Sequence, residues 1–192
     1  MTSWLWKGVM AVAIALPALS GVARAQVTDN DGCSNATLKG DYATRIHGKL
    51  LGIVTAAGPQ IFPDPLLIDG VAMTYFDGKG KLSQVDYVLR NGVQNPGPKD
   101  PETGFGVNEN GQYTVFADCT GQTVLDFGVV LIETKFVLAD QGRQSYGIES
   151  RQHVATGIPV GGVICDLPGG CEVLPQLHAD GTKLQVGLGT KK

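Results

Sequence analysis

The sequence has no cluster of basic residues and little charge of either sign. Charged residues occupy 17% of the 192 positions, with 15 Lys and Arg against 18 Asp and Glu, for a formal net charge of −3. Aromatic residues are also scarce, at 7%, and the only two tryptophans are Trp4 and Trp6. Because nucleic-acid binding depends on clustered cations that neutralise phosphates, we expect no nucleic acid as a partner.

No apolar run is long enough to cross a membrane as a helix, which takes about 20 residues. The run that follows Lys7 ends at Pro17, and positions 23–25 then supply the Ala-x-Ala pattern of a cleavage site. This three-part pattern predicts a signal peptide over residues 1–25, and it is less typical of a buried N-terminal helix. We therefore expect an exported protein, periplasmic or extracellular, with no membrane anchor after cleavage.

The cysteine spacing of a zinc site is missing. No C-x₂-C pair occurs, and the three histidines are separated from the cysteines in sequence, so we predict no metal and no cofactor. An even number of cysteines in an exported chain is typical of disulfides. We expect Cys165 to pair with Cys171, because the residues between them can reverse the chain. Cys33 would then pair with Cys119.

Sustained helical periodicity is absent after residue 26, whereas apolar and polar residues alternate between Gly, Asn and Asp clusters. The predicted strands cover residues 38–47, 67–76, 81–90, 112–118, 122–139 and 143–153, with a further strand at 183–188. Asp77-Gly78-Lys79-Gly80 predicts a hairpin turn, and Gly128 predicts a bend inside the long strand. The pattern indicates an all-β chain.

The strand at 81–90 has an apolar side and a polar side. The apolar side carries Val85, Tyr87 and Leu89, and the polar side carries Gln84, Asp86 and Arg90. Since an antiparallel sheet commonly has one solvated face, we expect the polar side to face water. Residues 95–111, rich in Pro, Gly and Asn, form the longest predicted connection. Connections of this length are often lids or binding loops.

About seven or eight strands joined by short reversals predict a meander, and pairing between neighbours favours up-and-down closure. We therefore predict one domain over residues 26–192, folded as a single antiparallel, mostly up-and-down β-barrel of about eight strands. A two-sheet β-sandwich is the alternative. The interior of an eight-stranded barrel is either filled by side chains or holds one small ligand.

Four segments carry a resemblance to a known group of proteins. They are Cys33 to Tyr42, Asp77 to Gly80, Gly111 to Val115 and Asp118 to Gly121. These segments resemble a group of uncharacterised bacterial secreted proteins whose architecture is similar to that of calycins and of the allene oxide cyclase barrel. The resemblance covers roughly residues 33 to 140. It implies a calycin-like barrel that binds or cyclises apolar small molecules.

Two carboxylates and four aromatic residues are the candidate site residues. Asp126 and Glu149 interrupt otherwise apolar or small-residue strands, and burial would raise their pKa values towards the range useful for acid or base catalysis. Tyr42, Tyr87, Phe116 and Phe127 are the candidate ligand-binding residues of an apolar cavity. The alternatives are a solvated outer face for the carboxylates and an ordinary core for the aromatic residues.

Three functions stay open on this sequence. The first is an exported β-barrel that binds a small apolar or amphipathic molecule. The second is a cofactor-free isomerase or cyclase that uses the same cavity. The third is an envelope or secreted interaction protein whose barrel is filled. The oligomeric state and the identity of the ligand are not encoded in any recognisable motif.

Overall fold

Antiparallel strands make up the architecture. The computed structural model describes residues 32–107 and 109–185, so the predicted signal peptide at 1–25 and residues 186–188 of the predicted last strand lie outside the described residues. Within the described ranges, the only helical element is a single 3₁₀ turn, η1 (Asp140–Gly142). No helix there is long and apolar enough to pass through a membrane.

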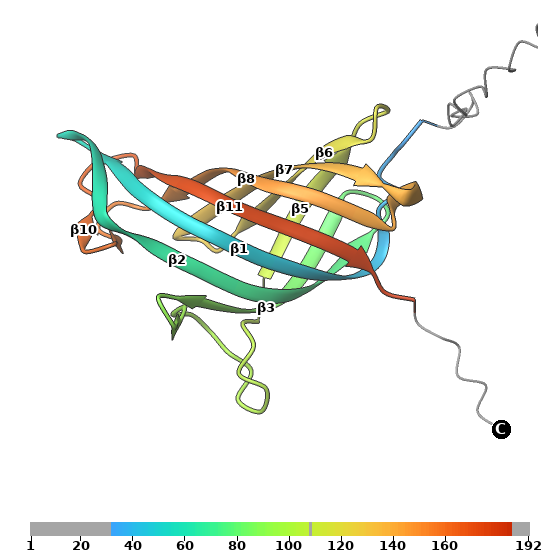
Figure 1. Ribbon diagram of the computed structural model, residues 1–192, viewed down its shortest axis with the longest axis horizontal. Helices are drawn as coiled ribbons and strands as arrows, with labels where there is room; N and C mark the ends of the chain where they lie inside the picture. The colour runs from blue at the N-terminus through green and yellow to red at the C-terminus, as the bar shows by residue number, and fades with distance from the viewer. Residues whose placement is uncertain (1–31, 108, 186–192) are drawn as a thin grey trace, which may run out of the picture. The chain divides into compact units, whose positions relative to one another are not determined.

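The strands are β1 (Lys39–Thr55), β2 (Gly58–Asp77), β3 (Lys81–Arg90), β4 (Val93–Gln94), β5 (Glu109–Val115), β6 (Thr120–Asp126), β7 (Val130–Ala139), β8 (Gln144–Val154), β9 (Pro159–Val160), β10 (Val163–Ile164) and β11 (Cys171–Lys183). Eight of them close into a ring (Figure 1). The main sheet has the order β2-β1-β11-β8-β7-β6-β5-β3-β4, and an additional β2–β3 ladder joins its two ends.

The ring has the up-and-down connectivity that the sequence predicts. Each strand of the ring pairs antiparallel with the ring strands before and after it in the chain, and β11 pairs with β1. The sheet closes on itself instead of splitting into two packed sheets. β4 is a short addition to β3 outside the ring, and β9 and β10 form a separate small sheet.

The predicted hairpin at Asp77 is confirmed. Phe76 pairs with Leu82 across the turn. The backbone amides of Lys79 and Lys81 donate to Asp77 Oδ1 at 2.6 and 3.0 Å. These two bonds satisfy amide groups that the turn would otherwise leave unpaired, which explains why Asp precedes Gly here.

The predicted single strand at 122–139 is wrong. Two strands, β6 and β7, cover this region, and a tight turn at Phe127-Gly128-Val129 separates them. The amide of Phe127 donates to the carbonyl of Val130 at 2.9 Å, and Gly128 has a φ of 79°, which favours glycine. Apolar residues lie on both faces of this region, so the alternation of apolar and polar residues does not show where the chain reverses.

β1 and β2 extend well beyond the predicted strands at 38–47 and 67–76. Their ladder continues to Thr55 and Gly58. β2 contains Pro63 and Pro65 in its first half, yet its ladder with β3 begins only at Ile68. The β1–β2 register also shifts between the pairs Leu50–Leu66 and Gly52–Ile61, so Pro63 and Pro65 lie in an irregularity of that ladder. Proline is tolerated there because its missing N–H removes no ladder bond.

Two clusters of buried side chains fill the interior towards its ends. The first contains Leu38, Tyr42, Phe76, Leu82, Tyr113, Val115 and Phe136. Its rings pack edge to face, with centroids 5.3 Å apart for Tyr42 and Phe76 and 5.0 Å apart for Phe76 and Tyr113. The second contains Leu50, Ile53, Phe62, Ile68, Val88, Val154, Val160, Cys165, Cys171, Val173 and Leu177.

Both predicted disulfides are confirmed. Cys33 pairs with Cys119, with Cα atoms 4.9 Å apart, and Cys165 pairs with Cys171, with Cα atoms 5.6 Å apart. The first bridge ties the start of the described chain to the β5–β6 turn, beside the first cluster. The second lies within the other cluster. Two disulfides fit the oxidising environment of an exported protein.

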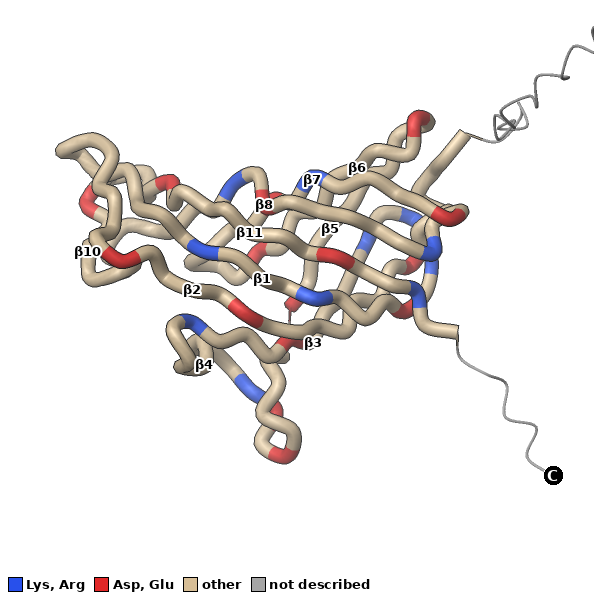
Figure 2. Tube along the Cα trace, viewed as in Figure 1, with Lys and Arg blue, Asp and Glu red and all other residues tan. Residues whose placement is uncertain are grey.

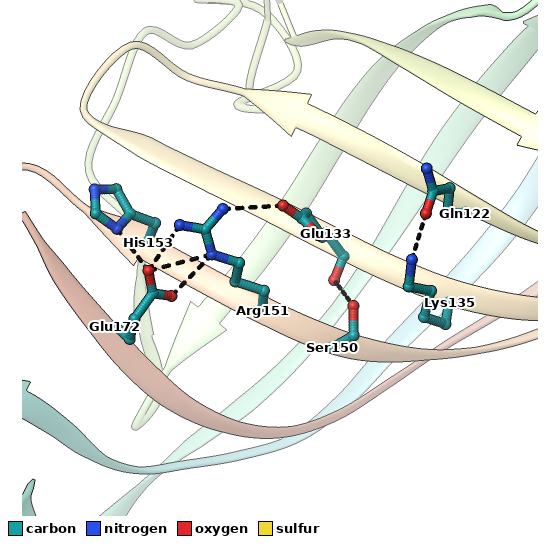
Figure 3. A network of polar contacts seen from close by, with 7 residues as sticks. All are labelled: Gln122, Glu133, Lys135, Ser150, Arg151, His153 and Glu172. Carbon is teal, nitrogen blue, oxygen red and sulfur yellow. Dashed lines mark hydrogen bonds and ion pairs between the residues drawn. The ribbon is translucent and has the colours of Figure 1, made fainter.

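The outer face of the barrel carries both charged and apolar side chains, and the exposed apolar ones include Val71, Met73, Val85 and Ile148. Figure 2 shows basic and acidic residues interspersed along the strands. On β7, β8 and β11, Arg151 links Glu133 at 3.0 Å and Glu172 at 2.7 Å, and His153 Nδ1 lies 2.9 Å from Glu172 (Figure 3). Such exposed pairs contribute little stability, so the barrel depends mainly on its interior.

Replacing both Cys33 and Cys119 by Ala is expected to lower the free energy of unfolding by up to about 4.5 kcal/mol. The bridge closes a loop with a sequence separation of 86, and the loss of that closure restores entropy to the unfolded chain. Urea denaturation of both proteins measures the difference. A loss below about 1 kcal/mol would contradict a stapling role for this bridge.

Candidate functional site

A cavity of about 730 Å³ lies inside the ring. Most of its wall is apolar, including Ile46, Leu50, Ile68, Phe76, Leu82, Val88, Leu125, Val130, Ile132, Phe136, Val154 and Leu177. Ligand sites of proteins commonly have volumes between about 300 and 1,000 Å³ and apolar walls with a few polar groups. The interior is therefore large enough to hold one small molecule.

One side of the ring is covered by a loop instead of a strand. β3 and β5 pair only from Lys81–Gln112 to Gln84–Glu109. Farther along β3, the amide of Gly106 donates to the carbonyl of Asp86 at 2.7 Å, and the amide of Asn95 donates to the carbonyl of Val88 at 2.9 Å. Loop residues 95–99, 106 and 107 line the cavity. This loop therefore forms the cavity wall where the sheet lacks a full ladder.

A chain of polar side chains crosses the wall from β1 to β5. Thr44 and Thr74 hydroxyls lie 3.4 Å apart, and Thr74 donates to Gln84 Oε1 at 2.8 Å. Gln84 Nε2 in turn donates to Glu109 Oε2 at 3.1 Å. These hydrogen bonds connect four strands through their side chains. They also satisfy polar atoms that burial would otherwise leave without a hydrogen bond.

Asp86 and Glu109 form a carboxyl pair at the end of this chain. Burial raises the pKa of both, and the neighbouring charge of Asp86 helps to raise that of Glu109 to about 7. A Cβ built on Gly106 would lie 2.5 Å from Glu109 Oε1 and 3.0 Å from Asp86 Oδ1. The pair therefore lies directly beneath the loop. Glu109 therefore keeps its proton up to about pH 7, next to the Asp86 carboxyl.

Arg90 and Glu149 enter the cavity from opposite walls. β8, which carries Glu149, is the fourth strand from β3 in either direction around the ring. Burial raises the pKa of Glu149 to about 8, although the positive charge of Arg90 acts in the opposite direction. The same burial lowers the pKa of Arg90. Glu149 is therefore a neutral acid near pH 7, in the same cavity as the half-buried guanidinium of Arg90.

Three buried atoms of the cavity residues have unused hydrogen-bonding capacity. Within residues 32–107 and 109–185, no hydrogen-bond partner is found for Arg90 Nε, Asn95 Oδ1 or Glu149 Oε1. All three residues line the cavity. A buried polar atom without a partner is costly, by roughly 1–3 kcal/mol, and a bound polar group would recover that cost.

The two predicted carboxylates have different environments. Glu149 lies on the cavity wall as described. Asp126 is exposed at the end of β6, where its Oδ1 accepts a hydrogen bond from the amide of Gly128 at 2.8 Å. Asp126 thus stabilises the β6–β7 turn at the rim of the cavity. A catalytic role for either residue stays a prediction.

Of the four predicted aromatic residues, Phe127 lines the cavity, at its rim. Tyr42 is fully buried in the first cluster, where its hydroxyl donates to the carbonyl of Gly142 and desolvation raises its pKa to about 12. Tyr87 packs against Phe105, with centroids 5.7 Å apart, and Phe116 is exposed. Ligand binding by these four residues stays a prediction.

The expected orientation of β3 is wrong. Gln84, Asp86 and Arg90 line the cavity, whereas Val85 and other residues of the apolar side face outwards. Alternation correctly separates the two sides but does not tell which one is enclosed. Because Asp86 and Arg90 were expected to face water, Arg90 and the Asp86–Glu109 pair were not predicted as site residues, although the polar alternation that contains Asp86 and Arg90 is visible in the sequence.

Comparison with known protein families, with characterised proteins and with solved structures gives no match to this chain. The resemblance to calycins and to the allene oxide cyclase barrel therefore stays a prediction. Within the described ranges, no three His, Cys, Asp or Glu side chains are grouped so that they could hold a metal ion. Function has to be inferred from the cavity and its polar residues.

Replacing Glu149 by Gln is expected to flatten the pH dependence of stability. Native Glu149 keeps its proton up to about pH 8, whereas unfolded Glu149 releases it near 4.5. As the pH rises between these values, the wild type loses stability by at most about 1.4 kcal/mol per pH unit from this group. The amide of the Glu149→Gln variant has no proton to release. Urea denaturation across this range measures both slopes, and equal slopes would contradict the assignment.

Proposed function

We propose that this protein is exported and binds a small amphipathic molecule inside its barrel. The cavity of about 730 Å³ carries the proposal, because an apolar space of this size is rare in a core that packs to fill itself. Two disulfides support export. The apolar wall suits the apolar part of a ligand, and the unpartnered atoms of Arg90, Asn95 and Glu149 suit its polar part.

Catalysis in the same cavity is the second candidate. Glu149, with a pKa of about 8, could give or take a proton near neutral pH, and Arg90 could stabilise a developing negative charge nearby. Such a pair is suited to an isomerisation or cyclisation that needs no cofactor. The filled-barrel interaction protein is less well supported, because the interior retains a cavity.

A tryptophan placed in the cavity is expected to block binding. Val88 is 6% exposed and lines the cavity, whereas Val85, on the same strand, is 38% exposed on the outside. We expect Val88→Trp to weaken binding of the neutral fluorophore N-phenyl-1-naphthylamine about tenfold by filling the space, and Val85→Trp to leave binding unchanged. Fluorescence titration measures both affinities, and circular dichroism verifies that each variant is folded.

Two results would count against cavity binding. One is a wild-type protein that gives no saturable fluorescence increase with the fluorophore. The other is an equal loss of affinity in both variants, which would place the fluorophore on the outer surface.

Mass spectrometry under native conditions separates binding from catalysis. We expect the protein purified from its own host to carry a small molecule in the cavity. For a binding protein, this molecule is recovered unchanged after long incubation with fresh protein. For an isomerase or cyclase, the bound molecule is a product, and the wild type forms it from a precursor of equal mass. The Glu149→Gln variant is expected to convert that precursor at least about a hundredfold more slowly.

A further inference from the structure

We propose that the ligand of the cavity is a neutral amphiphile whose head is a primary carboxamide or a group with the same pattern of one acceptor and two donors. This inference rests on the proposed binding function and specifies its substrate class. The head would lie among Arg90, Asn95 and Glu149, and the apolar chain would lie along the remaining wall.

The hydrogen-bonding pattern of the three unpartnered atoms supports this class. Arg90 Nε is a donor and Asn95 Oδ1 is an acceptor, and the protonated Glu149 offers Oε1 as its carbonyl acceptor when the proton is on Oε2. A primary carboxamide has one carbonyl oxygen, which can accept from Arg90, and two N–H groups, which can donate to Asn95 and Glu149. A carboxylate offers acceptors only, and an ammonium offers donors only, so each leaves part of this set unsatisfied.

The topology brings the three residues to one cavity. Arg90 is the last residue of β3, and it pairs with Val93, the first residue of β4. Asn95 comes directly after β4, so it lies close to Arg90. Glu149 reaches the interior from the opposite wall and lies close enough to Arg90 for each charge to affect the other's pKa. The head site is thus built from β3, the covering loop and β8.

The charges around the site also favour a neutral ligand. Below about pH 7, Glu109 is protonated, so Asp86 and Glu109 together carry at most one negative charge, against the one positive charge of Arg90. Glu149 is uncharged under the same conditions. The other charged or titratable wall residues, Lys99, Asp126 and His178, are exposed. A charged head would disturb this balance inside an apolar enclosure, at an unfavourable desolvation free energy.

The size of the cavity is compatible with such a molecule. At roughly 30 Å³ for a group the size of a water molecule, 730 Å³ corresponds to on the order of 20 non-hydrogen atoms. A medium-length aliphatic chain with a small head fits within this volume. The apolar residues on the wall would contact the chain, and the loop at 95–107 would cover the head.

A matched series of decyl compounds tests the proposal. Decanamide, decanoate, decylammonium and N,N-dimethyldecanamide are titrated against the full chain at about pH 6, with displacement of N-phenyl-1-naphthylamine as the signal. We expect decanamide to bind at least about tenfold more tightly than each of the others. The dimethyl compound is the matched control, because it retains the carbonyl oxygen and the chain but has no N–H group.

Variants connect the preference to the residues. Arg90→Met and Asn95→Leu are each expected to reduce the ratio of decanamide to dimethyldecanamide affinity about fivefold or more, and Arg45→Met, on the exposed outer side of β1, is expected to retain the wild-type ratio. If Arg90→Met does not fold, Asn95→Leu still tests the proposal, because the Asn95→Leu substitution removes no charge from the cavity.

The outcomes distinguish this inference from the proposed function. If the fluorophore does not bind, cavity binding itself fails. If the fluorophore binds but decanoate or decylammonium binds most tightly, or if the two amides bind equally, cavity binding stands and the carboxamide proposal is wrong. A wild-type ratio retained in both Arg90→Met and Asn95→Leu would likewise overturn the assignment of the head site.

Discussion

Closure of the eight-stranded ring is the constraint on which the rest of this structure depends. Once β2 pairs with β3 as well as with β1, every ring strand presents alternate residues to one enclosed space. The side that a strand turns inwards is then decided by the register of its neighbours and not by its own hydrophobicity. This is why β3 buries Gln84, Asp86 and Arg90 while Val85 faces outwards.

Enclosed polar side chains need partners, and the barrel supplies them in two ways. Thr44, Thr74, Gln84 and Glu109 form a continuous hydrogen-bonded chain, which leaves the carboxyl pair of Asp86 and Glu109 satisfied within the protein. Arg90 and Glu149 are different, because each has a buried atom for which the described part of the chain supplies no partner, beside an apolar space. Polar groups arranged in this way stabilise the fold poorly, but they suit the recognition of a ligand.

The incomplete ladder between β3 and β5 leaves part of the cavity wall without a strand. The loop at 95–107 replaces the missing strand contacts with two backbone hydrogen bonds to β3. Loops held by few bonds open more readily than central strands. The same segment therefore covers the carboxyl pair, contributes Asn95 to the cavity, and lies where a ligand could enter.

The sequence by itself determined the all-β class, the Asp77 hairpin and the Cys165–Cys171 loop, because turn residues and alternation act over short distances. The pairing of Cys33 with Cys119 then followed because no other cysteines were left, and the up-and-down barrel followed from the number of strands and their short connections. It also identified Glu149 as a carboxylate in an apolar setting. Only the tertiary structure decided that Arg90 and Glu149 line the same cavity from opposite walls, that Asp86 lies beside Glu109, and that Tyr42 belongs to a filled end. These relations depend on ring closure between strands far apart in the chain, and alternation along one strand cannot tell which of its two sides will be enclosed.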